Sequence, residues 1–483
     1  MHTPTIAVIG AGFSGTLLAL HLLRSCPSST RIQLIECAEA FGPGQAYSTT
    51  HADHLLNVPA GRMSAFPDQP SHFLDWLRRQ PDDVLGGLAP EAGSFVPRRL
   101  YGRYLRDLLA DSRAALPPNR LELVAGTVLG VAQDGSGLTL LLDQDRRLTV
   151  TLAVIATGNN ALAPLPVMDP MLVRHGLYRH DPLIPDALTG LPAEAPVLLV
   201  GTGLTMVDTV VTLLAAGHSG PIHALSRRGL LPRAHLATPA ATVPLPETND
   251  MPRGMRSLFR FVRAQSERVE REGGSWRGVI DALRPITQAL WQGWSQTEKR
   301  QFLAHARPWW DVHRHRMAPA IAARIEAARA SGQFMVHAGR ITSLGCQGQQ
   351  AQVSWQPRGA ASSETLNVAR VINCTGPSSD VTRLADPLLQ SLLGSGLARP
   401  DPMRLGLDVT TDGALRAANG DPSSRLFGIG PITRSALWEI TAVPDIRQQC
   451  EKLALHIAGT LHDLDVRASW TPPAAARLPG LAA

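Results

Sequence analysis

Short apolar runs that end in glycine recur along the chain, and helical stretches separate them. The first run, Thr5–Ile9 (TIAVI), is β-branched and apolar throughout, which is typical of a buried parallel strand. The loop GAGFSG follows at 10–15, Thr16–Leu23 has helical character, and Arg31–Ile35 reads as a second strand. The pattern therefore predicts a strand–loop–helix–strand unit at the N-terminus.

The same pattern returns later in the chain. Further strands are predicted at Leu152–Ala156, Pro196–Val200, Pro221–Leu225, Val371–Cys374 and Leu426–Gly430. Between about 231 and 330 the strand signal disappears, and helices are predicted at Ser257–Glu272, Gly278–Gln292, Gln296–Ala306 and Met317–Ala330. The fold class that follows is α/β, with two Rossmann-like dinucleotide-binding domains, one for FAD and one for NADPH, and a helical insertion.

The N-terminal loop has the residues that a dinucleotide requires. Its glycines permit a tight turn, a close backbone approach to the pyrophosphate, and close packing of helix on strand. Glu36, at the end of the second strand, lies 21 residues beyond Gly15, at the spacing of a carboxylate that binds ribose hydroxyls. The expected FAD contacts of this unit are Gly10, Gly12, Phe13, Ser14, Gly15 and Glu36.

Two later strands favour FAD over NAD at this first site. Leu152–Ala156 is followed by Thr157 and Gly158, as at the return crossing of flavoproteins that bind two dinucleotides. Leu426–Gly430 is a late strand of the kind that brings backbone amides to the flavin, so Gly430 is a further candidate. Taken singly, each is better explained as an ordinary buried strand, and it is their order along the chain that supports FAD.

A second, degenerate glycine loop, GTGLTM, begins at Gly201. Its candidate nucleotide contacts are Gly201, Gly203, Leu204 and Thr205, whereas Met206 replaces the third glycine. After the next strand the chain has Ser226, Arg227 and Arg228 where an NAD enzyme has an acid. An arginine pair can bind a 2′-phosphate, so NADPH is preferred to NADH, the alternative being a solvated basic turn.

Composition narrows the class of protein. The net charge is +6, with 46 basic and 40 acidic residues intermixed, which argues against nucleic-acid or membrane binding. The N-terminus has no basic region before its apolar stretch, and no long apolar run follows, so we expect a cytoplasmic protein. A homo-oligomer is possible, with the tryptophan-rich insert as an interface.

The cysteines and histidines do not indicate a redox or metal site. The five cysteines form no CxxC, which argues against a redox dithiol and a zinc site. His313 and His315 have no acid or cysteine at a usual ligand spacing, so no metal is expected. Five of the nine tryptophans lie between Trp276 and Trp310, either as packing anchors or as an aromatic wall over flavin or substrate.

Eight segments carry a resemblance to a known family. They are GAGFSG, GPGQAYS (42–48), LNVPAGRMS (56–64), RRLYGRYL (98–105), LVGTGLTMVD (199–208), WDVHRHR (310–316), INCTGP (372–377) and WEITAVPDIR (438–447). The chain resembles the bacterial FAD/NAD(P)-binding proteins of the YdhS-like family, distant relatives of flavin N-monooxygenases and class B flavoprotein monooxygenases. The resemblance implies that Asn57 and Val58 lie near the isoalloxazine and Val128 near the adenine. It also implies that Ala442 and Val443 present amides to the flavin.

These observations predict a flavin monooxygenase reduced by NADPH. A C4a-(hydro)peroxyflavin is expected to oxygenate a nitrogen or sulfur nucleophile of a small molecule with O₂, and no catalytic side chain is assigned. The alternatives are an NADPH:acceptor oxidoreductase, a catalytically silent flavin-binding protein and a FAD-only oxidase. The predicted domains are 1–190 (FAD), 191–365 (NAD(P)H, insert about 231–330), 366–468 (FAD, return) and a loosely ordered tail at 469–483.

Overall fold

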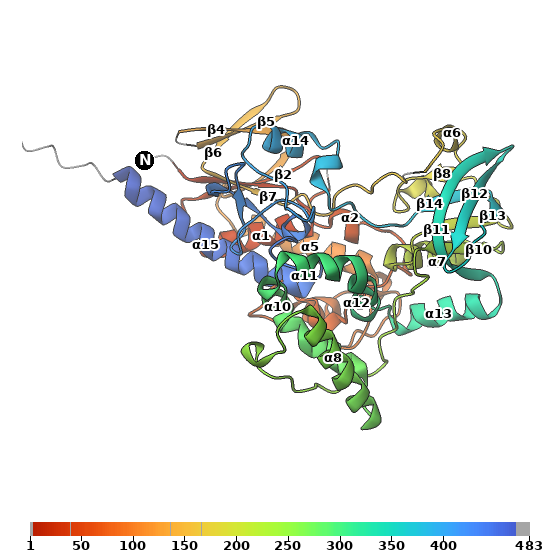
Figure 1. Ribbon diagram of the computed structural model, residues 1–483. Helices are drawn as coiled ribbons and strands as arrows, with labels where there is room; N and C mark the ends of the chain where they lie inside the picture. Colours follow the sequence, from red (N-terminus) through yellow and green to blue (C-terminus); the bar gives the residue numbers. More distant parts are fainter. Residues whose placement is uncertain (1–2, 39, 136, 166, 470–483) are drawn as a thin grey trace, which may run out of the picture.

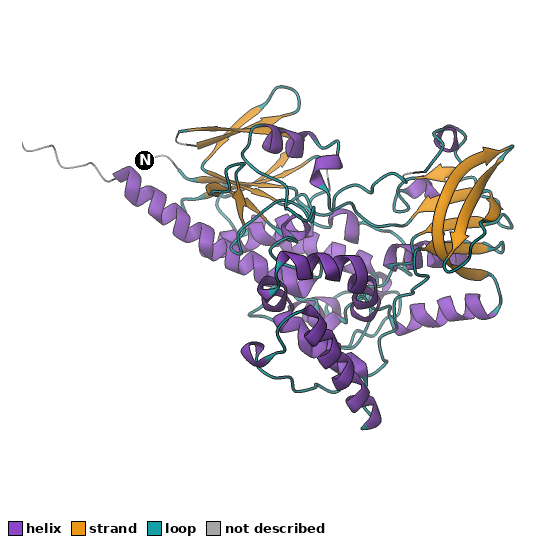
Figure 2. Ribbon diagram, viewed as in Figure 1, coloured by secondary structure: helices purple, strands orange, loops and turns teal. Residues whose placement is uncertain are grey.

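Two sheets, each with a parallel centre and antiparallel strands at one edge, organise the chain, each in its own lobe, with helices packed between and below them (Figures 1 and 2). The computed structural model describes residues 3–38, 40–135, 137–165 and 167–469. The architecture is mixed α/β with dinucleotide-binding topology, as the sequence pattern predicts.

The first sheet has six strands in the order β15-β16-β7-β1-β2-β3. Their bounds are β1 Thr5–Ile9, β2 Arg31–Glu36, β3 Leu121–Ala125, β7 Leu152–Ile155, β15 Ala414–Arg416 and β16 Pro422–Gly428. Successive residues of a strand point to opposite faces. Ile6 and Val8 therefore join one hydrophobic core, and Ala7 and Ile9 join the other.

Each face of this sheet is covered by a different layer. On one face lie α1 (Phe13–Ser25), α5 (Arg98–Ala114) and the long α15 (Val443–Ser469), which packs along α1. The other face is covered by a three-stranded antiparallel sheet and one helix, namely β4 (Val128–Asp134), β5 (Gly137–Leu142), β6 (Arg147–Val150) and α14 (Pro387–Gly394).

The second sheet has seven strands in the order β13-β12-β11-β10-β9-β14-β8. Their bounds are β8 Tyr178–Arg179, β9 Val197–Val200, β10 Ile222–Ser226, β11 Phe334–Gln347, β12 Gln350–Pro357, β13 Glu364–Val368 and β14 Arg370–Asn373. Helices α7 (Leu204–Ala215) and α13 (Pro319–Ala330) pack on it through a shared core.

The insertion between β10 and α13 is helical, as predicted. It contains α8 (Met255–Arg271), α9 (Trp276–Leu283), α10 (Thr287–Gly293), α11 (Gln296–Gln301), a π-helical turn (Phe302–Ala306) and α12 (Arg307–Arg314). The single helix predicted at 278–292 is wrong. Pro285 lacks a backbone N–H, and a 3-10 turn at Arg284–Ile286 separates α9 from α10 there.

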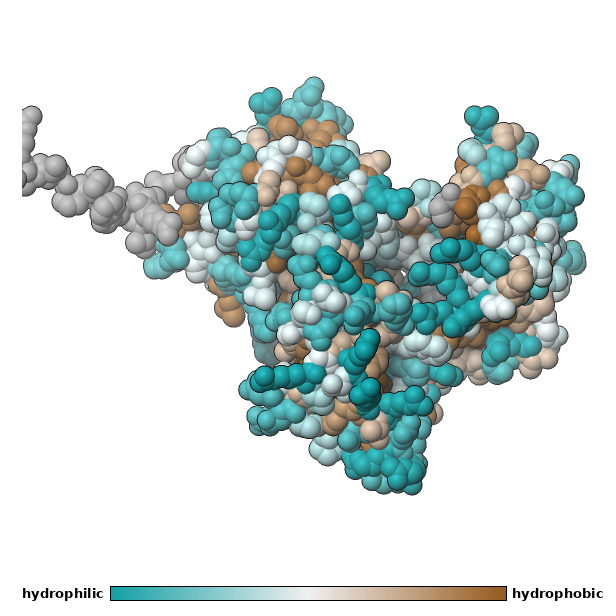
Figure 3. Space-filling view, in the orientation of Figure 1, coloured by the Kyte–Doolittle hydropathy of each residue, from teal (hydrophilic) through white to brown (hydrophobic). Residues whose placement is uncertain are grey.

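Short helices complete the first lobe and the link to the second. They are α2 (Gly44–Tyr47), α3 (His72–Arg78), α4 (Asp82–Leu85) and α6 (Met171–Arg174). Hydrophilic residues dominate the face of the molecule drawn in Figure 3, and the surface is hollowed between the two lobes. The described residues contain no helix that is long and apolar enough to span a bilayer.

The second sheet extends past both predicted domain boundaries. Strand β8 precedes residue 191 and strand β14 follows residue 365, yet both pair within this sheet. Helix α13 belongs to the core of the second lobe, so the insertion ends before it rather than at about 330. The tail predicted at 469–483 lies, beyond Ser469, outside the described residues.

Candidate functional site

The first glycine loop is shaped by close backbone contacts. Gly10 has φ +104°, and a Cβ there would lie 2.5 Å from the carbonyl oxygen of Ala156 at the end of β7. A Cβ on Gly15 would lie 1.8 Å from the Gly10 carbonyl oxygen. Gly12 is the N-cap of α1 and makes no side-chain cap, so the first amides of the helix remain available for an anion.

A cavity of about 780 Å³, called the large cavity below, opens at this loop. Its lining includes Val128 and Leu388 in the first lobe, Thr205 and Asp208 of α7, and Thr441 before α15. The predicted site residues that line it are Gly10, Gly12, Phe13, Ser14, Glu36, Val128, Thr157, Gly158 and Thr205. Its volume, and a lining drawn from both lobes, suit a bound cofactor.

Glu36 lines the large cavity, but its carboxylate is already engaged with the loop. It accepts hydrogen bonds from the amides of Ala11 at 2.7 Å and Cys37 at 2.9 Å. Two acceptor oxygens can take further bonds, so this arrangement holds the carboxylate at the loop and leaves capacity for ribose hydroxyls.

The second glycine loop repeats the geometry of the first. Gly201 has φ +113°, and a Cβ there would lie 2.4 Å from the carbonyl oxygen of Cys374 at the end of β14. Gly203 is the N-cap of α7, again without a side-chain cap. Met206, which replaces the third glycine, is fully buried in the core of the second lobe. The chain therefore contains two equivalent strand–loop–helix units.

A second cavity, of about 270 Å³, lies where α7, the insertion and the segment before α15 meet; we call it the interdomain cavity. It is lined by Gly203, Leu204 and Thr205 at the start of α7, and Thr375 and Gly376 after β14. Facing them are the charged residues Arg307, Asp311, His315, Arg434 and Glu439. Thr205 and Thr441 line both this cavity and the large cavity, so the two adjoin.

Side chains from the two lobes are bonded to each other beside these cavities. Arg98, at the start of α5, contacts both carboxylate oxygens of Asp208 in α7, at 2.6 and 3.2 Å. The His54 ring bonds Thr212 of the same helix at 2.8 Å. These bonds fix α7 against the first lobe.

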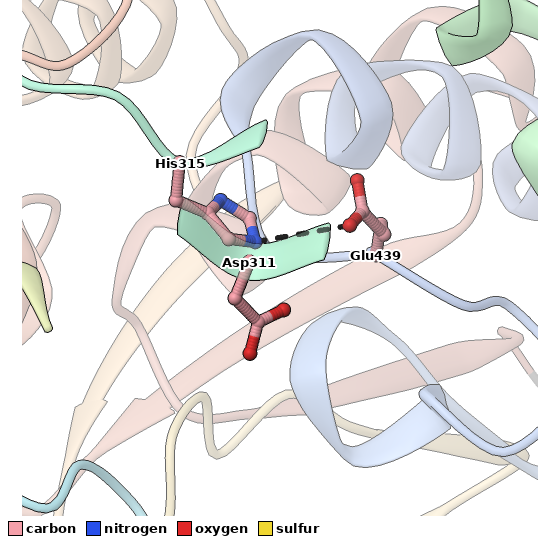
Figure 4. A group of neighbouring side chains, drawn as sticks. All are labelled: Asp311, His315 and Glu439. Carbon is pink, nitrogen blue, oxygen red and sulfur yellow. Dashed lines mark ion pairs between the residues drawn. The ribbon is translucent and has the colours of Figure 1, made fainter. Parts of the chain in front are cut away.

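A buried charged cluster, made of Glu439 and Arg314, closes the interdomain cavity on the side of the insertion. Figure 4 shows Glu439 with its neighbours Asp311 and His315. Glu439 accepts a hydrogen bond from the indole of Trp310, and its carboxylate lies 2.8 Å from Arg314, which is only 8% exposed. Burial acts to raise the pKa of Glu439, but Arg314 and then His315 hold it below the usual value. Glu439 is therefore ionised near neutral pH although it is buried.

Asp311, His315 and Glu439 converge closely enough to hold a cation. However, Arg314 already neutralises Glu439, and Arg307 pairs with Asp311 at 3.2 Å. Burial lowers the pKa of His315, so its 3.8 Å contact with Glu439 joins a neutral ring to a carboxylate near neutral pH. Guanidinium groups therefore supply the positive charge that a metal ion would bring.

Cys374 also lines the interdomain cavity, but its thiol is buried in the core of the second lobe. Burial raises the pKa of Cys374 to about 12, and its sulfur contacts the Thr209 hydroxyl at 3.6 Å. Such a thiol is not ionised near neutral pH, so it does not serve as a nucleophile.

We expect Glu439→Gln to destabilise the protein by ~3 kcal/mol, because it leaves the buried Arg314 with only Asp445, 3.7 Å away. Urea unfolding followed by circular dichroism measures this loss. The folded-state pKa of Glu439 lies below 4.5, so its contribution is complete above that pH and is lost on acidification. The difference between wild type and variant should therefore shrink below about pH 4.5.

The matched control is Glu326→Gln, which removes an exposed carboxylate paired with Arg329. That variant should stay within ~0.5 kcal/mol of wild type. Equal unfolding free energies for Glu439→Gln and wild type would contradict the role of the cluster.

Several predicted site residues lie outside both cavities. Gly15 and Gly201 shape the loops, Gly430 lies beside Ser14, and Val443 begins α15 next to Ala442. Asn57 uses its carbonyl to bond His235, and Val58 is buried in the first core. Ser226 bonds Thr202 at 2.9 Å, whereas Arg227 is exposed and Arg228 half-exposed beside it. The cofactor contacts of these residues stay predictions.

Other residues at the cavities were not singled out from the sequence. Arg98 and Asp208 lie within two of the motifs quoted above, but their pairing spans 110 positions. Arg434 has no local signature; burial and then the charge of Arg307 lower its pKa to about 10, so it remains a cation. Only the fold brings these groups together.

Comparison with known proteins identifies the N-terminal part of the chain. Residues 7–160 match a family model described as FAD-NAD(P)-binding, so this part of the chain is a FAD/NAD(P)-binding domain. No curated protein sequence matches the chain.

Solved structures share the fold across nearly the whole chain. The reduced form of ornithine hydroxylase from Pseudomonas aeruginosa is 13% identical, with a TM-score of 0.62, over 95% of this chain and 100% of that chain. An ornithine N-hydroxylase from Kutzneria sp. 744, with reduced FAD, NADP⁺ and L-ornithine, is 13% identical with a TM-score of 0.62, over 97% and 100%. L-lysine 6-monooxygenase from Pseudomonas syringae is 14% identical with a TM-score of 0.61, over 96% and 100%. At these identities the likeness shows the fold alone.

Proposed function

We propose that this chain is a FAD-dependent oxidoreductase reduced by NADPH, and that it oxygenates a nitrogen or sulfur atom of a small molecule with O₂. One observation carries the proposal. Two equivalent glycine loops, each at the start of a helix, open onto adjoining cavities that share Thr205 and Thr441. Two dinucleotides bound there would bring their reactive ends together.

The first loop fits FAD. Gly12 lines the large cavity, and a Cβ there would meet only Gly44, at 3.4 Å. The loop itself therefore has room for a side chain at this position, and such a side chain would fill part of the cavity. The free amides at the start of α1 suit a pyrophosphate, and Glu36 suits a ribose. The large cavity is lined both by Val128, the residue expected near the adenine, and by Thr441, next to the residues expected near the flavin.

The start of α15 supports placing the flavin at this end. Thr441 and Ile446 line the large cavity on either side of Val443, the first residue of α15. Helix N-termini carry partial positive charge and stabilise nearby anions. Reduced flavin gathers negative charge on its pyrimidine edge, so this helix would favour the reduced state.

The second loop supports a pyridine nucleotide. The start of α7 lines the interdomain cavity, which suits a second pyrophosphate. Arg307 and Arg434 face it from the opposite wall and add positive charge. Arg227 and Arg228 follow β10, the position from which a 2′-phosphate can be reached.

When bound, the flavin supplies the redox chemistry, taking hydride from the nicotinamide and activating O₂. The protein's own part is to bind, orient and exclude water. The Arg98–Asp208 pair holds α7, and with it the second nucleotide, against the first lobe. The buried charged cluster of Glu439 and Arg314 closes the interdomain cavity. No side-chain nucleophile is required.

The choice of oxygenation on nitrogen rests on the similar structures, two ornithine hydroxylases and a lysine monooxygenase. Sulfur remains within the proposal because a thioether, like an amine, has a nucleophilic lone pair. The cytoplasmic location and a homo-oligomer also stay predictions.

The test is anaerobic stopped-flow reduction of the FAD-loaded protein by NADPH, followed by mixing with oxygenated buffer. We expect the band near ~450 nm to bleach, and a lasting band near ~370–380 nm to precede its return. Immediate return with stoichiometric H₂O₂ would instead assign an NADPH:acceptor oxidoreductase. Failure of NADPH to reduce the flavin would leave a silent flavin-binding protein or a FAD-only oxidase.

A further inference from the structure

A third cavity, of about 290 Å³, lies between α11 of the insertion and loops of the first lobe. It shares no lining residue with the large cavity or the interdomain cavity, so it is separate from both proposed cofactor sites. Its volume is at the lower end of the usual range for ligand pockets, about 300–1,000 Å³. Five of the residues that line it are charged, namely Lys299, Arg399, Asp401, Asp408 and Arg416. The third cavity therefore suits a small, charged ligand.

Three of these charged residues pair with one another. Arg399 lies 2.7 Å from the carboxylate of Asp408, and Arg416 lies 3.8 Å from it. The other two, Lys299 and Asp401, form no ion pair with any described residue. They are therefore the two charged groups of the third cavity that a ligand can pair with.

Asp401 is a buried carboxylate with one oxygen unused. Its side chain lies in a residue that is only 5% exposed. The Oδ2 atom accepts hydrogen bonds from the amides of Met403 at 2.9 Å and Leu405 at 3.2 Å, whereas Oδ1 accepts none from the described residues. A buried carboxylate is costly unless it is paired. Its free oxygen is a site for a cationic group of a ligand.

Lys299 is the free cation of the same cavity. It is half-buried, its Nζ lies 5.1 Å from the centre of the Trp291 ring, and it donates no hydrogen bond to a described residue. Burial lowers the pKa of Lys299 and raises that of Asp401, and the charge of each acts in the opposite direction on the other. The ammonium and the carboxylate are thus close enough to interact, but they do not touch.

We propose that the third cavity binds a small zwitterion, an α-amino acid with a short apolar side chain, whose ammonium group pairs with Asp401 and whose carboxylate pairs with Lys299. A lone anion would leave Asp401 unpaired, and a lone cation would leave Lys299 unpaired. Met403, Val409 and Ala436 supply apolar surface for the ligand's side chain. This is a peripheral binding site apart from the flavin and the nucleotide, so the inference does not rest on the proposed function.

The chain offers a reporter for this site, because Lys299 and Lys452 are its only lysines. Reductive methylation with carbon-13 formaldehyde keeps the charge of each amine and gives each lysine its own NMR resonance. Lys299→Met identifies the Lys299 resonance by its loss. Lys452 is exposed on α15 and serves as the internal control.

The test is titration of the methylated, oxidised, FAD-loaded protein, without NADPH, with L-leucine. Two fragments are titrated in parallel: 4-methylpentanoate, which lacks the ammonium group, and 3-methylbutylamine, which lacks the carboxylate. We expect leucine to shift the Lys299 resonance alone, and to bind at least about tenfold more tightly than either fragment, because each fragment leaves one charged side chain unpaired. If leucine leaves the Lys299 resonance in place or shifts both resonances equally, or if a fragment binds as tightly as leucine, the proposal is overturned.

Asp401→Asn tests the second contact. Asparagine keeps an oxygen for the amides of Met403 and Leu405 but removes the charge, so leucine should bind at least about tenfold more weakly. The matched control is Asp412→Asn, at an exposed carboxylate outside the lining, which should change affinity less than about twofold. Unchanged leucine binding by Asp401→Asn would show that Asp401 only holds its own loop, and would overturn the proposal.

The outcomes remain separable from those of the proposed function. If Asp401→Asn fails to fold, the comparison of leucine with its two fragments on the wild-type protein still decides. NADPH takes no part in the titration, so a protein whose flavin NADPH does not reduce can still bind leucine at Lys299. In that case the peripheral site stands and the proposed function fails.

Discussion

Gly12→Val is expected to give a folded but colourless protein with FAD affinity reduced at least ~100-fold. A Cβ at this position would lie 3.4 Å from Gly44, an ordinary contact, so the loop itself tolerates a side chain. The valine methyls would instead occupy the large cavity where a pyrophosphate approaches the start of α1. Loss of two phosphate hydrogen bonds, each worth ~1.5–3 kcal/mol, accounts for the magnitude.

The measurement is the flavin-to-protein absorbance ratio after gel filtration, together with equilibrium titration of the apoprotein with FAD. Gly203→Val is the matched control, because it makes the same change in the second glycine loop. That variant should remain yellow and lose reduction by NADPH. A fully yellow Gly12→Val protein would contradict the placement of FAD at the first loop.

Gly15 illustrates why this distinction needs the structure. Both Gly12 and Gly15 belong to the motif GAGFSG, yet a Cβ on Gly15 would lie 1.8 Å from the Gly10 carbonyl oxygen. Substitution of Gly15 therefore disturbs the loop, whereas substitution of Gly12 disturbs its ligand. The sequence predicts the motif, but only the backbone geometry separates the two roles.

The repeating parts of the fold could be predicted because their signals are local. The strand predicted at Thr5–Ile9 has the same bounds in β1, since an apolar β-branched run ended by glycine needs no distant partner. Helix α1 begins at Phe13 rather than at Thr16, because the loop supplies the first helical turn. That turn carries the amides on which the proposed site depends.

The cavities could not be predicted, because their walls come from segments far apart in the chain. Arg314 lies in the basic motif WDVHRHR, where no local signal indicates burial, but the fold buries it against Glu439. The antiparallel strands β12 and β13 were not predicted either, although β12 alternates buried and more exposed residues, the pattern of a half-buried strand. Long-range pairing decides burial, and burial decides the chemistry of each charged group.

Replacing Arg227 and Arg228 with alanine is expected to raise the KM for NADPH about tenfold or more and to leave the KM for NADH nearly unchanged. A 2′-phosphate carries close to two negative charges, and arginine can bind it with paired hydrogen bonds. Arg227 is exposed, so solvent and salt screen its charge. The loss of NADPH binding free energy should therefore lie at the low end of the range for charged hydrogen bonds. The preference should also weaken as salt increases.

The control is the double variant Arg31→Ala/Arg147→Ala, which removes the same charge from exposed positions in the first lobe. If its effect on NADPH matches that of the Arg227/Arg228 variant, general electrostatic attraction explains the preference. Equal effects of the Arg227/Arg228 variant on NADPH and NADH would show that the pair is only a surface turn. A change confined to NADPH would support a phosphate clamp after β10, because NADH has every other group of the nucleotide and lacks only the 2′-phosphate.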